Sequence, residues 1–85
     1  MNMTTVVIDI PKETPLALKQ TDIEVGETLR MAAAVKLCEL GRLSSGAAAL
    51  LAGVPRVIFL AKLADYGVDT FSLTEEEIQQ ETRLA

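Results

Sequence analysis

The side chains in this sequence that could do chemistry are mainly basic, and they gather in its middle third. Between positions 30 and 64 the chain has one acid, Glu39, against Arg30, Lys36, Arg42, Arg56 and Lys62, a net charge of +4. The 85-residue chain as a whole carries −4, so acidic segments flank this basic one. A positive patch on an acidic protein can attract phosphate groups. The alternative is that the five basic residues are scattered solubilising charges.

The sequence offers little basis for catalysis. It contains no histidine, and its one cysteine, Cys38, falls on the apolar face of an expected helix, where packing is the usual role. Ser44 and Ser45 have no nearby base, and the acids of 75–77 are typical of a solvated helix start. We therefore expect no catalytic residues, no metal site, no cofactor and no enzymatic activity.

Composition favours a small aliphatic helical domain, since 49% of residues are hydrophobic and only 4% are aromatic. A chain of this length buries a modest core, so a subunit partner would stabilise it. The longest uncharged stretch, 43–55, is too short and too interrupted to span a bilayer. The apolar run near the N-terminus follows no basic region, and a single cysteine excludes an internal disulfide. We expect a cytoplasmic protein.

A short strand is predicted at 4–10, "TTVVIDI", because this run is β-branched and partly alternating and Pro11 ends it. One strand cannot satisfy its own backbone groups, and 68–72 is only a weak second candidate. A strand from a second subunit is the expected partner. The order strand, short helix, long helix is also that of ribbon-helix-helix repressors, but Asp9 would face phosphates there, so we expect the ribbon to serve dimerisation.

Two helices should follow the strand. Thr14 and Pro15 resemble an N-cap and a first helical position, with the helix running to about Lys19. Thr21 and Glu24 then form a capping-box pattern that starts a longer helix ending near position 41.

The longer helix has two apolar stripes. One contains Met31, Ala34 and Cys38, with Val35 beside them; the other contains Val25, Leu29, Ala32, Ala33, Leu37 and Leu40. A surface helix normally has one stripe, so burial on both sides is indicated, with one side facing another subunit. The alternative is a central core helix in a monomer.

The stretch 44–68, "SSGAAALLAGVPRVIFLAKLADYGV", predicts a helix-turn-helix unit. Ser44 or Ser45 can cap a first helix that Gly53 ends, and a second helix should run from Pro55 to Tyr66. Two helices that cross at a tight turn need small residues there, and these are Ala48, Ala49, Ala52 and Gly53. A large apolar residue six positions after the glycine, Phe59, should anchor the second helix.

Two sets of contact residues follow from this unit. We expect Arg42, Arg56 and Lys62 to contact DNA phosphates, with hydroxyls supplied by Ser44 and Ser45. The second helix is unusually apolar for one that reads bases, and Val57 and Leu60 suit a protein contact equally well.

A family resemblance also covers about 4–72. The residues that carry it are "AAAVKL", "ELGRLS", "LAG", "FLAKL" and "YGV", following "VVIDIP". In these the chain resembles an uncharacterised prokaryotic family of short antitoxin-type proteins. The resemblance implies a strand with a helix-turn-helix core, and an association with toxin–antitoxin modules and PIN-domain nuclease toxins. The acidic tail from Asp69 onward, which contains Phe71 and Arg83, would then contact the toxin.

The sequence thus predicts a mainly α fold with a short N-terminal strand, in which 1–72 form a helix-turn-helix-like domain and 73–85 an acidic tail or helix. The dimer should form through the strand and the long helix. The expected function is that of an antitoxin-like DNA-binding autorepressor that neutralises a nuclease-type toxin. The alternative is a protein-interaction module that has kept the helix-turn-helix shape and lost DNA binding.

Overall fold

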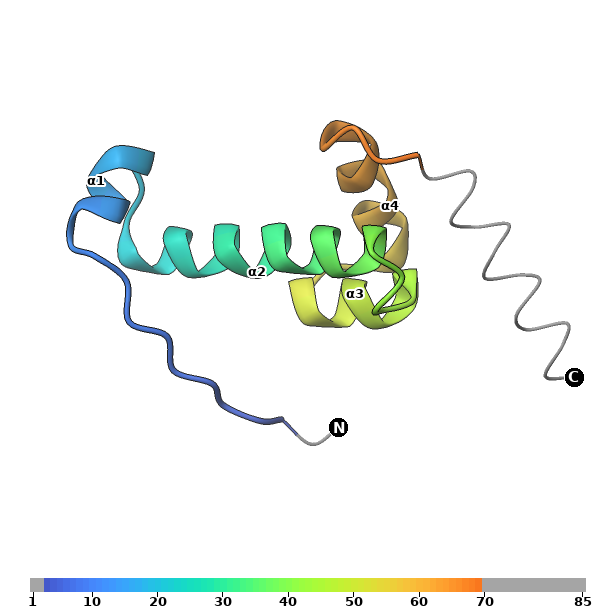
Figure 1. Ribbon diagram of the computed structural model, residues 1–85, viewed down its shortest axis with the longest axis horizontal. Coiled ribbons are helices and arrows are strands. Elements are labelled where there is room, and N and C mark those ends of the chain that lie inside the picture. Colours follow the sequence, from blue (N-terminus) through green and yellow to red (C-terminus); the bar gives the residue numbers. More distant parts are fainter. Residues whose placement is uncertain (1–2, 70–85) are drawn as a thin grey trace, which may run out of the picture.

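The fold is built from four helices arranged around one long rod (Figure 1). The computed structural model describes residues 3–69. In chain order its helices are α1 (Glu13–Leu18), α2 (Asp22–Glu39), α3 (Ser45–Ala52) and α4 (Arg56–Asp65). The rod is α2, with α1 at one end and α3 and α4 at the other. The prediction of a mainly helical chain is confirmed.

The ends of α2 and α3 are fixed by the polar residues and glycines that the sequence indicates. The hydroxyl of Thr21 accepts a hydrogen bond from the Glu24 N–H at 3.2 Å, and the Glu24 carboxylate accepts one from the Thr21 N–H at 3.1 Å. Gly41 follows the last residues of α2 with a left-handed φ of 76°. Ser44 caps α3 by accepting from the Ala47 N–H at 3.1 Å. The predicted caps at these positions are confirmed.

The first helix begins two residues earlier than expected, and Thr14 is not its cap. The structure places Lys12 at the N-cap without a side-chain hydrogen bond. The Thr14 N–H instead donates to the Pro11 carbonyl at 3.0 Å, so the turn already starts at the proline. α1 ends at Leu18, and its C-cap residue Lys19 adopts a left-handed φ of 56°.

The predicted N-terminal strand is absent from the single chain. Residues 3–10 contain no strand or helix and run back below α2 in the view of Figure 1. The physical reason is that a strand needs a neighbour for its backbone groups, and residues 3–69 offer none. The weak strand candidate 68–72 lies partly outside the described residues, and the predicted acidic tail or helix 73–85 lies wholly outside them.

The core sits at one end of α2, where this helix meets α3 and α4. Its buried members are Ala34, Val35, Cys38, Ala48, Ala49, Phe59 and Leu63. These include the α2 stripe of Ala34 and Cys38, with Met31 half-buried at its edge. In the other predicted stripe Val25 is buried and Leu37 half-buried, but Leu29, Ala32, Ala33 and Leu40 stay outside the core. One stripe is therefore covered within the chain and the other only in part.

Within residues 3–69, no single helix is both long and apolar enough to cross a membrane. Only α3 and α4 taken together reach that length and apolarity, and a sharp bend separates them.

Candidate nucleic-acid interface

The turn between α3 and α4 has the geometry of a helix-turn-helix. The two helix axes are bent by 92° at a break of three residues, 53–55, within the range typical of such units. Gly53 takes a left-handed φ of +77°, which a residue with a Cβ adopts only with strain. Its N–H donates to the Ala49 carbonyl at 2.9 Å, and the Val54 N–H donates to the same carbonyl at 3.1 Å. The predicted fold-back at Gly53 is confirmed.

Packing under the turn follows the predicted pattern of small and large residues. Ala48 and Ala49 are buried on α3, and their short side chains let α2 and α4 approach. Phe59 is fully buried and anchors α4, and Leu63, one turn later, is fully buried beside it in the same cluster. Lys62, which lies where such units usually have an apolar residue, is exposed instead. The core position is taken by Leu63.

Arg30 ties the turn to the long helix. Its Nε donates to the Leu51 carbonyl at 3.0 Å, which joins α2 to the last turn of α3. A Cβ built on Gly53 would lie 3.9 Å from Arg30 Nη2, so the guanidinium lies beside the turn itself. A cation at a helix C-terminus also interacts favourably with the helix dipole. Nothing in the spacing of residues predicted this contact, because it joins positions 21 residues apart.

Ser45 and Arg56 form a polar link between the starts of α3 and α4. The Arg56 Nε donates to the Ser45 Oγ at 2.9 Å. Ser45 is only 1% exposed, so its hydroxyl lies in the interior rather than at a surface where DNA could reach it. We therefore drop Ser45 from the DNA-contacting set. Arg56 remains exposed, and the serine fixes one edge of its guanidinium.

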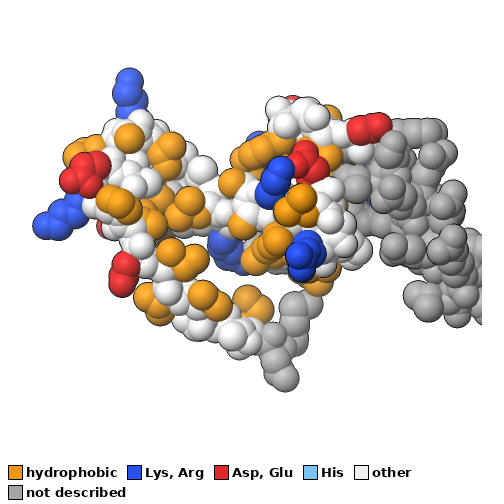
Figure 2. All heavy atoms as spheres, viewed as in Figure 1, with side chains coloured by type: hydrophobic (Ala, Val, Ile, Leu, Met, Phe, Trp, Pro, Cys, Tyr) orange, Lys and Arg blue, Asp and Glu red, His pale blue; other side chains and the backbone are white. Residues whose placement is uncertain are grey.

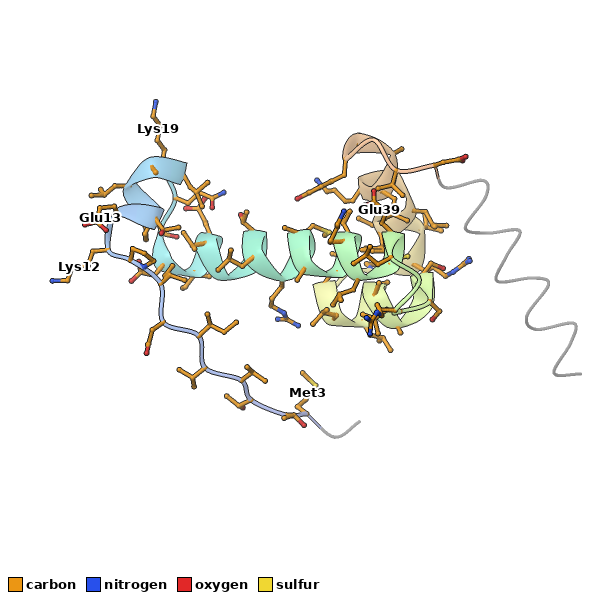
Figure 3. The ribbon with its side chains drawn as sticks, viewed as in Figure 1. Met3, Lys12, Glu13, Lys19 and Glu39 are labelled. Carbon is orange, nitrogen blue, oxygen red and sulfur yellow. The ribbon has the colours of Figure 1, made fainter. Side chains whose placement is uncertain are left out.

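Of the predicted phosphate contacts, Arg42 and Lys62 carry charges that are available to a ligand. Both side chains are exposed, and neither makes a hydrogen bond or ion pair with the described part of the chain. Lys36, in contrast, pairs with Glu39 at 2.7 Å. Arg42 lies between α2 and α3, and Lys62 lies on α4. Lys12 and Lys19 are at the α1 end of the rod, far from both (Figure 3).

α4 also carries exposed apolar side chains. Val57 is 76% exposed and Ile58 is 46% exposed. Leu60, predicted with Val57 as a partner contact, is half-buried and packs against the core. Ile58, rather than Leu60, is therefore the residue exposed with Val57 for a partner contact. The other two predicted partner contacts, Phe71 and Arg83, lie outside the described residues.

Comparison with known proteins places the whole chain in one family. A family model described as an uncharacterised protein family, UPF0175, matches residues 1–85. The chain belongs to UPF0175. No curated protein and no solved structure matches it. The UPF0175 match confirms the predicted membership of an uncharacterised family, and it assigns no activity to the chain.

Proposed function

We propose that this protein is a small helix-turn-helix DNA-binding protein of the antitoxin type, which binds its own operator as a homodimer and neutralises a nuclease-type toxin. The observation that carries the DNA-binding part is the 92° bend between α3 and α4 over a three-residue break with Gly53 in the left-handed conformation. Such a turn places a second helix so that it can enter the major groove. The exposed cations Arg42, which precedes α3, and Lys62, on α4, support the same proposal.

The contacts that we propose divide by type. Arg42 and Lys62 bind phosphates through their exposed charges. Ser44 adds its hydroxyl, which accepts from the Ala47 N–H and keeps its own proton to donate. Arg56, which is exposed at the start of α4 and donates from Nε to Ser45, contacts a phosphate or a guanine edge. Val57 lies at the start of α4, where an apolar side chain can contact a thymine methyl group.

The test is an operator-binding titration with DNA from the protein's own promoter over a range of salt concentrations. A variant that lacks one phosphate-binding cation should show a slope of log affinity against log salt that is smaller by about one. Arg42→Ala and Lys62→Ala should each do so, whereas Lys19→Ala, at the α1 end, should leave the slope unchanged. No binding to the promoter at low salt, or equal effects of all three variants, would contradict the DNA-binding proposal.

A second candidate function is favoured by the exposed side chains of Val57 and Ile58, which form an apolar surface where base-reading helices usually carry polar groups. In this candidate α4 binds another protein, and no DNA is bound. Val57→Asp should then abolish a co-purifying complex while the homodimer persists. Leu16→Asp, at an equally exposed position on α1, is the matched control. A complex that survives Val57→Asp places the interface elsewhere.

The toxin-binding part of the proposal is supported by the family resemblance alone. It predicts that the full chain binds a nuclease-type protein encoded beside it and inhibits its nuclease activity. Phe71→Ala and Arg83→Ala should weaken this inhibition without changing operator affinity. Inhibition that is unchanged in both variants would remove these residues from the toxin interface.

A further inference from the structure

Residues 3–10 are an unpaired segment with exposed apolar side chains. Met3 is 77% exposed, Val6 is 75%, Val7 is 82% and Ile8 is 71%. Figure 2 shows hydrophobic side chains along this segment. Its backbone groups make no backbone hydrogen bond within the described chain, where the first such bond outside a helix runs from the Thr14 N–H to the Pro11 carbonyl. Exposed backbone and exposed β-branched side chains together are the features of a strand without its neighbour.

We propose that residues 4–10 pair with the same residues of a second copy of this chain, in an antiparallel two-stranded ribbon centred on Val7. This deepens the proposed function, which rests on a homodimer, by naming the surface and the register through which the two copies meet. Self-pairing of one segment gives a symmetric interface, in which each contact occurs twice. The sequence of residues 4–10 itself supports a second copy of the chain as the partner.

The register centred on Val7 gathers the apolar positions on one side of the ribbon. With Val7 opposite Val7, Val6 faces Ile8 of the second copy and Thr5 faces its Asp9. Residues directly opposite one another point to the same side of a ribbon. One side then carries only Val6, Ile8 and Ile10 from each chain together with Thr4. A shift by one residue would mix apolar and polar positions on both sides.

Charge disfavours a parallel in-register pairing of the same two segments. A parallel in-register pair would set Asp9 beside Asp9, and like charges placed directly opposite one another destabilise a sheet. In the antiparallel register the carboxylate meets the Thr5 hydroxyl instead. Pro11 has no N–H to donate to the ladder, so the paired segment ends at residue 10. These features suit a second copy of the chain without requiring any other protein.

The apolar side of such a ribbon needs cover, because an isolated two-stranded ribbon is marginal in water. α2 leaves Leu29 and the neighbouring Ala32 and Ala33 incompletely covered. The segment already turns back below α2 in the view of Figure 1. The ribbon and this incompletely covered stripe together provide one continuous apolar interface for the dimer.

The test is disulfide cross-linking of single-cysteine substitutions in the full chain, without DNA. Facing residues of an antiparallel pair have Cα atoms close enough for a disulfide, so Val7→Cys should cross-link on oxidation on the order of tenfold faster than Leu16→Cys on α1. Ile8→Cys, whose facing residue is Val6, should be slow. Wild type measures any background from Cys38, which is buried.

Each result decides the proposal. Fast cross-linking of Val7→Cys with slow cross-linking of Ile8→Cys supports it. Equal rates at the two positions indicate parallel in-register strands and overturn it, as does a rate at Val7 no higher than at Leu16. Helical circular dichroism equal to that of wild type shows that each variant is folded, because residue 7 lies outside the core. Since no DNA is present, failure of the ribbon leaves the operator-binding result standing.

Discussion

At the scale of single residues, the polar contacts at helix ends determine where each helix starts and how it is joined to its neighbours. The Glu24 carboxylate is the titratable member of the α2 capping box. A hydrogen bond from the Thr21 backbone N–H, and then one from the Thr21 side chain, hold the pKa of Glu24 below its ordinary value of 4.5. The charged carboxylate is therefore the form that stabilises the start of α2.

Because the folded-state pKa of Glu24 is lowered, its contribution to stability is complete above pH 4.5 and is lost as pH falls through the lower folded-state value. An NMR titration of the Glu24 carboxyl should give a midpoint below 4.5. Thr21→Ala should raise this midpoint only part of the way, since the stronger backbone hydrogen bond remains. A midpoint at the ordinary value in the wild type would show that the capping box does not persist in solution.

Arg30 should contribute measurably to stability although its side chain is exposed. Arg30→Ala removes the hydrogen bond to the Leu51 carbonyl and should lower the free energy of unfolding by about 1 kcal/mol in urea titrations. The matched control is Lys36→Ala. Its ion pair with Glu39 is surface-exposed and joins positions three apart, so the change should stay within about 0.5 kcal/mol. Equal losses of stability in the two variants would show that the Arg30 hydrogen bond does not stabilise the turn.

At the scale of elements, the α3–α4 turn depends on Gly53, whereas Gly26 lowers the stability of α2. Gly53→Ala should destabilise the protein by about 1 to 2 kcal/mol, because φ is +77° there. Gly26→Ala should stabilise it by up to about 1 kcal/mol, because Gly26 lies within α2 and its added Cβ would meet nothing within 4 Å. Thermal unfolding of both variants gives the comparison; a shift of the same sign in both would contradict the turn geometry.

The elements that the sequence predicted well are those specified by local chemistry. Caps at Thr21 and Ser44 and the breaks at Gly41 and Gly53 depend on residues within four positions of one another. The site was harder to predict, because its decisive contacts are distant in sequence. The serine doublet gave no indication that Ser44 would be exposed and Ser45 buried against Arg56. Residues 4–10 form no strand in the single chain, because residues 3–69 offer their backbone groups no neighbour.

At the scale of the whole molecule, the single chain leaves much apolar surface in water, and the exposed large hydrophobic residues extend from the N-terminal segment to α4. If two copies cover part of it, unfolding releases two chains, and the midpoint temperature must rise with protein concentration. Differential scanning fluorimetry should show this rise in the midpoint temperature when protein concentration is varied over about a hundredfold range.

The matched variants for that experiment are Val7→Asp and Leu16→Asp, which place the same charge at two exposed positions of the single chain. Val7→Asp should abolish the concentration dependence and Leu16→Asp should preserve it. A wild-type midpoint that does not move with concentration would argue for a folded monomer.

The position of the core has a consequence for how such proteins diversify. Residues 3–10 contribute nothing to the buried cluster. The α2 helix separates α1 from that cluster, and its 18 residues make it about 27 Å long. If two copies pair through this segment as proposed, substitutions there after gene duplication would change which sister chains associate and would leave α3 and α4 unaltered. Two sister proteins that no longer mix in one cell would then need only a handful of changes at the N-terminus.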